Sequence, residues 1–358
     1  MKFLKIIVTF ISDILAELYN KCILEGVYPK LFKIARITPI LKKGGLATDI
    51  KSYRPISNLP TLNKILEKIL HRRLYSFLTD SNIISPTQFG FRKNKNTSQC
   101  TISLISNILP SFQYKNYSIT VFIDNSKAFD TVEPDLLMEK LSRYGVRGVS
   151  HNLIKSYIQD REHYIFVNDT FSYTLTSNLG VAQGSCNGPL MYLTYANDLD
   201  KLLEDAHVVT YADDTAITIS GPCLKTLESR MNKILQLLYD WSNYNKLTIN
   251  KTKTKYILFG PRTPDIDIEL KIGNGILERV EKIDYLGITL DSKLKFVDHI
   301  SKISTKLSQI AGITYKLGKN FDLTTAKIFI YIFNIDIWYN GVGGNFACTK
   351  LRLHAKIT

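Results

Sequence analysis

The sequence predicts an α+β fold, because short β-branched runs and longer stretches with helical periodicity alternate along one chain. Thr120–Ile123 is a brief apolar run of the kind that forms a buried strand. Val208–Thr210 and Ala216–Ile219 are β-branched runs on either side of four residues, which predicts a β-hairpin. Longer segments repeat apolar residues at helical spacing instead, so we expect helices around an antiparallel sheet.

The expected helices account for much of the chain outside these strands. The segment 134–145 illustrates the argument: Pro134 suits the first helical position, Leu137 and Leu141 share one face, and Gly145 suits the end. The predicted helices are 12–25, 61–79, 97–110, 134–145, 150–160, 188–205, 223–245 and 295–318. Further expected strands are Tyr164–Phe166, pairing with Tyr173–Leu175 around a turn at Asn168-Asp169, and the segments Ile268–Lys271 and Ile288–Leu290.

The four residues inside the predicted hairpin are Tyr211, Ala212, Asp213 and Asp214. Two adjacent carboxylates repel each other, so a fold keeps them where something offsets their charge. A divalent cation does so, since Mg²⁺ takes a few carboxylate oxygens and leaves its other positions to water and phosphate. The alternative is an ordinary polar turn, because Asp is common in turns.

A second acidic position, Asp124, follows the predicted strand Thr120–Ile123. It converges with the hairpin carboxylates if the two strands are neighbours in one sheet. Strand side chains alternate between faces, so Asp213 and Asp214 share a site only if the chain turns there. We therefore expect Asp124 and Asp213 to be the main metal ligands and Asp214 a secondary one.

A glycine-containing loop, Gly180–Leu190, leads into the expected helix at 188–205. Its glycines allow close approach of the backbone to a ligand. Pro189 suits the start of the helix. Such a loop is by itself only a weak indication of binding.

The charge distribution points to a polyanionic partner. The net charge is +14, and residues 1–100 hold 17 Lys and Arg against 6 Asp and Glu, which leaves +11 in this part of the chain. Concentrated basic charge fits a region that grips phosphates, and the alternative is a merely solvated basic face.

Composition also excludes several classes of protein. No run of 18 apolar residues is present, which argues against a membrane segment. The five cysteines are far apart and lack zinc-site spacing, so we expect reduced thiols in an intracellular compartment. The six histidines show no partnered spacing and no Ser-His-Asp order appears, so nucleophilic catalysis is poorly supported.

Taken in order, these segments resemble the reverse transcriptases of non-LTR (LINE-type) retrotransposons and are most similar to the jockey group. The similarity extends over roughly residues 11 to 345. The segments that carry it are Lys42–Gly44, Tyr53–Pro60, Lys64–Glu67, Gln88–Lys93 with Thr97, Phe122–Asp130, Gly180–Leu199, Tyr211–Asp214, Trp241 with Asn245–Thr254, and Tyr285–Gly287.

The resemblance implies a right-hand polymerase with fingers, an antiparallel palm sheet bearing the acidic hairpin, and a short helical thumb. The implied boundaries are an N-terminal helical extension at 1–25, fingers and palm at 26–292 (fingers about 26–115, palm about 116–292), and a partial thumb at 293–358. It also implies a nucleotidyltransferase, an RNA-directed DNA polymerase that uses an RNA template, a DNA primer and dNTPs. Two Mg²⁺ ions, with Mn²⁺ as a substitute, would be held by Asp124, Asp213 and Asp214.

The same resemblance suggests which side chains contact the incoming nucleotide. Lys64 and Arg54 are the first choices for the triphosphate, and Lys42, Lys43 and Arg92 are alternatives. Arg54 has a second interpretation, since an Arg-Pro at a strand start also suits a buried ion pair.

Further contacts follow from position in the family's motifs. Phe129 would lie beneath the deoxyribose and exclude a 2′-hydroxyl, although an aromatic residue is also ordinary in a core. Gln183 and Gly184 would sit beside the templating base pair, and Lys253 would approach the pyrophosphate. The predicted primer and template contacts are Tyr211, Ala212, Tyr285, Leu286 and Gly287.

The sequence departs from the family pattern at a few positions. Ala182 replaces a usual proline, Cys186-Asn187 replace apolar residues, and Asn125 follows the first aspartate where an apolar residue is commoner. The family's endonuclease domain is not recognisable here, so we expect nicking activity on another polypeptide, or its loss.

Two other interpretations stay open. One is a catalytically weak or silent RNA-binding remnant of such an element, and the other is an intron maturase or retron polymerase. An active enzyme is expected inside the cell, in the cytoplasm when translated and in the nucleus during target-primed synthesis.

Overall fold

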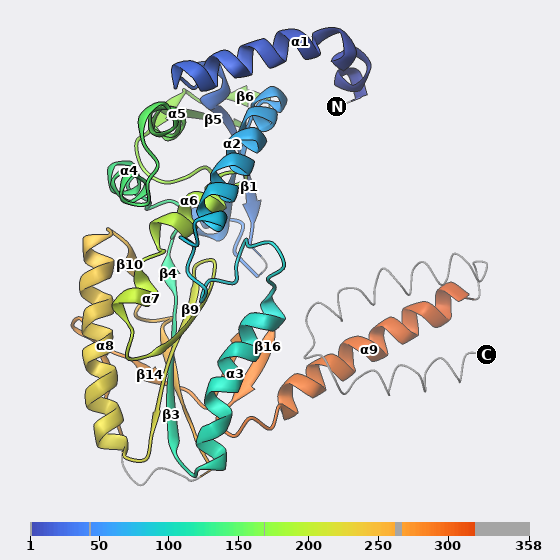
Figure 1. Cartoon of the computed structure of the whole chain (residues 1–358). Coiled ribbons are helices and arrows are strands. Elements are labelled where there is room, and N and C mark those ends of the chain that lie inside the picture. Colours follow the sequence, from blue (N-terminus) through green and yellow to red (C-terminus); the bar gives the residue numbers. More distant parts are fainter. Residues whose placement is uncertain (1, 43, 168, 262–266, 319–358) are drawn as a thin grey trace. The chain divides into compact units, whose positions relative to one another are not determined.

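The computed structural model describes residues 2–42, 44–167, 169–261 and 267–318 of the chain (Figure 1). The chain forms two compact units, each assembled from segments that are distant in sequence. Unit 1 comprises residues 1–86, 125–202 and 240–249, and unit 2 comprises residues 87–124, 203–239 and 250–358. Each unit combines helices with strands, which confirms the predicted α+β class. The predicted boundaries at 25, 115 and 292 remain predictions.

Unit 1 contains a sheet with the strand order β2-β1-β5-β6, and β7 also pairs with β5. Strand β1 is antiparallel to β2 and parallel to β5. The strands of unit 1 are β1 (Ile34–Leu41), β2 (Tyr53–Asn58), β4 (Asn125–Ser126), β5 (Arg161–Val167), β6 (Thr170–Phe171), β7 (Leu175–Ser177) and β10 (Thr248–Ile249).

The hairpin predicted around residues 168–169 is present as β5, β6 and β7, but its register is not the predicted one. Phe166 pairs with Phe171, and His163 pairs with Leu175. Position 168 lies outside the described residues. Val167 pairs with Thr170, and the partner of β5 is divided into the separate strands β6 and β7.

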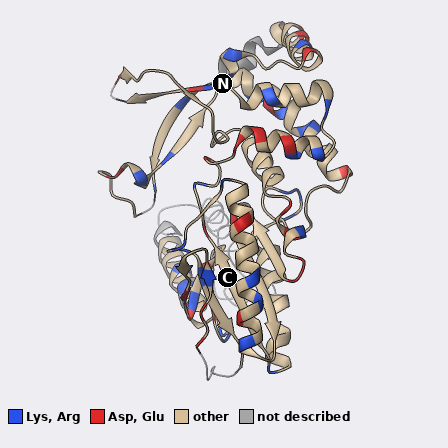
Figure 2. Ribbon diagram, turned by 90° about the vertical axis from the view of Figure 1, so that its left-hand side faces the viewer, with Lys and Arg blue, Asp and Glu red and all other residues tan. Residues whose placement is uncertain are grey.

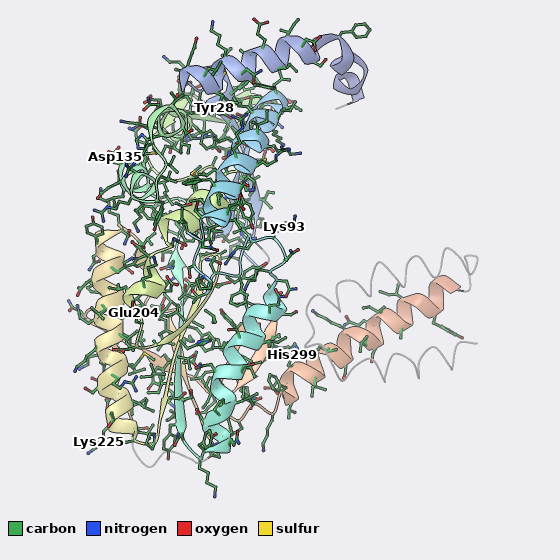
Figure 3. All side chains as sticks on the ribbon, in the orientation of Figure 1. Tyr28, Lys93, Asp135, Glu204, Lys225 and His299 are labelled. Atoms are coloured by element: carbon green, nitrogen blue, oxygen red, sulfur yellow. The ribbon has the colours of Figure 1, made fainter. Side chains whose placement is uncertain are left out.

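The helices of unit 1 pack around one hydrophobic core. They are α1 (Lys2–Glu25), α2 (Thr61–Asp80), α4 (Pro134–Arg143), α5 (Gly148–Ile158), α6 (Gly188–Tyr195) and α7 (Leu199–Leu202). Tyr28, labelled in Figure 3, is buried in this core with Leu66, Leu137 and Tyr192. The helices predicted at 61–79, 134–145 and 150–160 are confirmed, whereas the first helix begins at Lys2 rather than at residue 12.

The single helix predicted at 188–205 is wrong, because α6 ends at Tyr195 and α7 begins only at Leu199. The Nζ of the buried Lys140 donates to the carbonyl oxygen of Tyr195 at 2.6 Å and to Oδ1 of Asp198 at 2.9 Å. The Asn197 side chain meanwhile bonds the backbone of Ser85. These hydrogen bonds satisfy polar groups of residues 195–198, so residues from other elements stabilise the break between α6 and α7.

Unit 2 is built on a sheet with the order β14-β11-β3-β9-β8. Every pair in it is antiparallel except β11 with β14, so the predicted antiparallel arrangement holds around the central strand. The strands are β3 (Tyr117–Ile123), β8 (His207–Tyr211), β9 (Asp214–Gly221), β11 (Lys255–Phe259) and β14 (Glu278–Arg279).

Two long helices flank this sheet. Helix α3 (Thr97–Gln113) contacts β3, β8 and β9, and Figure 1 shows α8 (Leu224–Tyr244) on the opposite side of these strands. Both helices confirm predictions, at 97–110 and 223–245. The last residues of α8, from Asp240 onward, belong to unit 1.

The remaining elements of unit 2 are two small hairpins and a long helix. They are β12 (Lys271–Ile272) with β13 (Gly275–Ile276), β15 (Lys282–Tyr285) with β16 (Ile288–Asp291), and α9 (Val297–Gly318). The strand predicted at Ile268–Lys271 is wrong, since the strand starts at Lys271, whereas those at 288–290 and the helix at 295–318 are confirmed. His299, labelled in Figure 3, lies near the start of α9. The part of the predicted thumb (293–358) that runs from 319 to 358 lies outside the described residues.

None of the helices within the described ranges is both long and apolar enough to cross a membrane.

Candidate active site

Asp124 stands directly after β3, the buried middle strand of the unit 2 sheet. Its backbone is fixed by the loop that precedes β11. The N–H of Asp124 donates to Oγ1 of Thr254 at 3.3 Å, and its carbonyl oxygen accepts from the N–H of Asn250 at 2.8 Å. Because Thr254 is fully buried, this loop gives the aspartate a defined position at the end of the strand.

The acidic hairpin is tighter than a four-residue tip. Tyr211 and Asp214 form the last pair between β8 and β9, so only Ala212 and Asp213 make the turn. Asp214 is the first residue of β9 and is not part of the tip, which corrects the predicted placement of the carboxylate pair. Ala212 has φ +60°, a conformation that residues other than glycine adopt infrequently.

The register of the sheet places Asp124, Asp213 and Asp214 at the same end of the unit 2 sheet. Ile123 of β3 pairs with Thr215 of β9, so the next position on β3 is Asp124 and the next on β9 is Asp214. Asp124 and Asp214 therefore lie beside each other at the ends of neighbouring strands, and Asp213 precedes Asp214 in the turn. The predicted convergence depended on β3 and β9 being neighbours, and they are.

The surroundings of Asp214 disfavour its charged form, first through burial and then through the neighbouring carboxylates. Packing of protein atoms around its carboxyl, and then the negative charges of Asp213 and Asp124, raise the pKa of Asp214 to about 6. Solvent still reaches this residue, so the two like charges are the part of the effect that a bound cation would reverse. One cation is already nearby, since Nζ of Lys253 lies 3.9 Å from Oδ2 of Asp124.

The donor set suits a hard divalent cation. Three carboxylates supply only oxygen ligands, and their mutual repulsion is relieved by positive charge. Within the described ranges, no three His, Cys, Asp or Glu side chains are already arranged as a metal-binding group. The chemistry of the three carboxylates therefore fits a metal ion.

The primer-contact residues predicted on the β15–β16 hairpin are partly withdrawn from the surface. Tyr285 is 5% exposed, its ring lies 5.1 Å from that of Phe122, and its hydroxyl is 3.6 Å from Sγ of Cys100. Burial also raises the pKa of Tyr285 well above its usual value. The Tyr285 ring is thus part of the core in this structure. Leu286 is half-buried and Gly287 is exposed at the turn.

Two other predicted contacts lie in the same unit. Arg92 is half-buried, and its Nη1 donates to the carbonyl oxygen of Gln88 at 3.4 Å. Lys93, labelled in Figure 3, follows it in the loop ahead of α3. Tyr211 is half-buried at the end of β8 and packs against the unit 2 core.

The cations predicted to meet the triphosphate lie in unit 1, apart from Arg92. Lys64 is exposed in the first turn of α2, and Arg54 is exposed on β2, opposite Ile40 of β1. The alternative of a buried ion pair for Arg54 is therefore wrong. Nζ of Lys42 donates to the carbonyl oxygen of Lys51 at 2.8 Å, and position 43 lies outside the described residues. Figure 2 shows Lys and Arg in blue on the ribbon.

Three more predicted residues gather around the glycine-containing loop of unit 1. The side chain of Gln183 donates to Oδ1 of Asp130 at 2.7 Å, and its carbonyl oxygen accepts from the N–H of Ser57 at 2.7 Å. Gly184 has φ +102° and is exposed beside that contact. The half-buried Phe129 packs on Tyr192 with ring centroids 4.8 Å apart. Phe129 is thus partly a packing residue and partly accessible.

Some residues matter to these sites although the sequence predicted no role for them. Glu67 is fully buried in unit 1, where its carboxylate accepts from the Tyr157 hydroxyl at 2.7 Å and from the N–H of Cys186 at 3.1 Å. It thereby fixes the loop that carries Gln183 and Gly184. Only the position of Glu67 on the buried face of a predicted helix hinted at this.

In unit 2 the overlooked residues are Thr254, Asn250, Gln88 and Gly90. All four belong to segments that carry the family resemblance, but nothing in the sequence indicated that they contact Asp124 or the acidic turn. Such contacts join residues more than a hundred positions apart.

Comparison with known proteins identifies the family of the chain. Residues 40–290 match the family described as Reverse transcriptase (RNA-dependent DNA polymerase). The chain is 32% identical over 339 residues to the probable RNA-directed DNA polymerase from transposon BS of Drosophila melanogaster, covering 92% of this chain and 37% of that protein. It is 31% identical over 326 residues to the RNA-directed DNA polymerase from mobile element jockey of the same species, covering 88% and 35%.

The chain therefore spans about a third of the length of these curated relatives. Among solved structures, the apo telomerase from Candida tropicalis truncated from its C-terminal domain is similar, with a TM-score of 0.50 at 14% identity over 75% of this chain and 55% of that one. This last likeness concerns the fold alone. The comparisons confirm the predicted resemblance and the predicted fold class.

Proposed function

Because the chain belongs to the reverse transcriptase family, a family of nucleotidyltransferases, we propose that it is an RNA-directed DNA polymerase of a non-LTR retrotransposon. It would add dNTPs to a primer 3′-hydroxyl opposite an RNA template. The observation that carries the proposal is the register of β3 with β9, which sets Asp124 beside Asp214 and next to the Ala212-Asp213 turn.

The carboxylates would hold the metal ions of the reaction. Asp124 and Asp213 are the proposed main ligands of two Mg²⁺ ions, and Asp214 adds negative potential beside them. A pair of such ions stabilises the attacking and leaving oxygens of an in-line displacement at phosphorus. The chain's own contribution is to fix these side chains in advance, through Asn250 and Thr254 at Asp124 and through the turn at Asp213.

Other residues would bind the substrates. The exposed Lys64 and Arg54 are proposed to meet the triphosphate, with Lys253 near the leaving pyrophosphate. For the primer terminus we propose contact with the Leu286–Gly287 turn, since Tyr285 is occupied in the core. Synthesis at a nicked chromosomal target would take place in the nucleus, after translation in the cytoplasm, with nicking by another polypeptide.

The accessible part of Phe129 is proposed to select the sugar. A rigid ring beneath the deoxyribose leaves no room for a 2′-hydroxyl, so rNTPs are rejected sterically. Phe129→Ala should raise rNTP incorporation relative to dNTP incorporation. An unchanged ratio in a variant that still extends primers would remove this assignment.

A catalytically silent RNA-binding remnant is the second candidate. The observation in its favour is that the described residues contain no preformed three-ligand metal group. The departures from the family pattern at Cys186 and Asn187 are weaker evidence for a remnant, because hydrogen bonds to Glu67 hold both residues in the folded loop.

Primer extension on poly(rA)/oligo(dT) with Mg²⁺ separates the two candidates. The wild type is assayed beside Asp213→Asn and beside Asp135→Asn, a matched control at an exposed aspartate on α4 (Figure 3). We expect extension by the wild type and by the control, and none by Asp213→Asn. RNA binding without extension by any of the three proteins would instead identify the remnant.

A further inference from the structure

A short extended segment ahead of α3 lies alongside β8, the outer strand of the acidic hairpin. Residues 87–90 run parallel to β8, with a bridge between Gln88 and Thr210. The N–H of Phe89 donates to the carbonyl oxygen of Thr210 at 2.8 Å, and the N–H of Thr210 donates to that of Thr87 at 3.0 Å. The backbone of this segment is thereby aligned with the strand that ends at the acidic turn.

The side chain of Gln88 continues this contact into the turn itself. Its Oε1 accepts from the N–H of Ala212 at 3.0 Å and from the N–H of Gly90 at 2.7 Å. Its Nε2 lies 3.4 Å from the carbonyl oxygen of Ala212, which it donates to. One amide side chain thus satisfies both backbone polar groups of Ala212, which lies in the turn beyond the last strand pair.

Gln88 is not placed to contact a ligand. It is 7% exposed, both lone pairs of its Oε1 accept a hydrogen bond, and its amide nitrogen points at the same turn. A buried amide used in this way fixes backbone geometry. The geometry it fixes is that of the two peptide units that flank Ala212: the bond from the N–H restrains the unit joining Tyr211 to Ala212, and the bond to the carbonyl oxygen restrains the unit joining Ala212 to Asp213.

Close packing at Gly90 holds the turn from a second direction. A Cβ atom at this position would lie 2.2 Å from the backbone nitrogen of Ala212 and 2.9 Å from the carbonyl carbon of Tyr211. No side chain fits there unless the turn moves. Gly90 therefore allows the 87–90 segment to approach the turn, and Gln88 bonds it.

We propose that Gln88 is a positioning residue, which holds the Ala212–Asp213 peptide so that the Asp213 carboxylate faces Asp124. The inference rests on the proposed polymerase function. It names what stabilises the turn from outside. Such support is needed because Ala212 adopts φ +60°, a conformation that glycine would favour and alanine does not. Displacements of about 1 Å at a reacting centre can cost about 100-fold in rate, so such a contact matters to turnover.

The first experiment measures hydrogen exchange of the Ala212 amide at single-residue resolution. Gln88→Met keeps the length and burial of the side chain but removes the acceptor, so exchange at Ala212 should rise about fivefold or more. Gln88→Glu keeps an oxygen that accepts the same two N–H bonds and should retain protection. Unchanged exchange in Gln88→Met would overturn the proposal. A general rise that includes the β3 amides would also overturn it, because it would show a merely structural role.

The second experiment measures steady-state primer extension. Gln88→Met should lower kcat about 10- to 100-fold while the KM for dNTP stays within about twofold, because the turn is misplaced and the nucleotide contacts are not. The matched control is Gln99→Met. Gln99 accepts a backbone N–H, that of Asn96, in the capping box of α3, and is exposed. A wild-type kcat for Gln88→Met would contradict the proposal.

Gly90→Ala provides a test that leaves Gln88 in place. The added Cβ displaces Ala212, so exchange at Ala212 should rise and kcat should fall as in Gln88→Met. It decides the question if Gln88→Met does not fold, and wild-type values in Gly90→Ala would then overturn the proposal. A wild-type protein that extends no primer would refute the polymerase function, whereas the exchange results would still decide whether Gln88 holds the turn.

Discussion

The β8–β9 and β15–β16 hairpins of unit 2 both have two-residue turns, and they stabilise the turn backbone differently. At Leu286-Gly287 both residues have positive φ, +48° and +86°, as in a type I′ turn, and glycine supplies part of this conformation locally. At Ala212-Asp213 only Ala212 has positive φ, as in a type II′ turn, where glycine is usual. The acidic turn is held by Gln88 and Gly90, which lie far away in sequence.

The carboxylates on the two hairpins have pKa values that are shifted in opposite directions. Asp284 on β15 accepts from Nζ of Lys302 at 2.8 Å and 2.9 Å, and these bonds, with that from Thr289, lower its pKa. Asp214 on β9 has a raised pKa, through its surroundings and two like charges. The charge of Asp284 is paired within its own hairpin and with α9, while Asp214 lies among like charges. The proposed function assigns the binding role to the second of these hairpins.

The largest expected effect concerns activity. Asp124→Asn should reduce primer extension by about 100- to 1000-fold or more, since it removes a proposed ligand of the metal ions that would stabilise the transition state. Asp284→Asn should leave extension within about twofold once the protein is folded. Steady-state rates on a defined RNA template check both variants, and equal losses would remove the functional distinction between the hairpins.

The next effect concerns stability as a function of pH in the presence of a chelator. The raised pKa of Asp214 means that the unfolded chain releases its proton first, so the free energy of unfolding falls as pH rises from about 4 to about 6. The lowered pKa of Asp284 acts in the opposite sense. Its stabilisation is present above the usual pKa of Asp and is lost as pH falls through the lower folded value.

Thermal unfolding between pH 4 and pH 8 tests this contrast. At pH 7 the Tm of Asp214→Asn should exceed that of the wild type by up to a few degrees, and the difference should vanish near pH 4. Asp284→Asn should have a lower Tm than the wild type at pH 7. Shifts of the same sign in both variants would show that the two carboxylates do not differ as described.

The smallest effect distinguishes the turns themselves. Gly287→Ala places a side chain at φ +86° and should destabilise the protein by about 1 kcal/mol. Ala212→Gly removes the strain of a side chain at positive φ but increases the conformational entropy of the unfolded chain. These effects oppose each other, so the free energy of unfolding should change by less than about 1 kcal/mol. Urea denaturation measures both, and a large loss for Ala212→Gly would contradict external support of that turn.

The contrast also explains what the sequence predicted well. Strand β3, the acidic hairpin and helices such as α2 have strong periodicity over their whole length, so local pattern was sufficient. The three aspartates were assigned because a pair of adjacent carboxylates is unusual on a hairpin. Strands β3 and β9 are neighbours, as that assignment required, and the role of the aspartates as metal ligands stays a prediction.

The errors arose where distant groups decide the local structure. The break between α6 and α7 depends on Lys140 from another helix, and the position of Asp124 depends on Thr254. Tyr285 looked like a surface contact because its burial against Phe122 and Cys100 is a tertiary property. Gln88 carried no expected role for the same reason.

The close approach at Gly90 bears on how genomic copies of such elements are judged. A single-nucleotide change in a glycine codon would place a side chain 2.2 Å from the Ala212 nitrogen while the Tyr-Ala-Asp-Asp tetrapeptide stayed intact. Survival of that tetrapeptide is consequently an incomplete sign of a working copy. Gly90→Ala is the variant that shows whether an intact tetrapeptide is sufficient for activity in this chain.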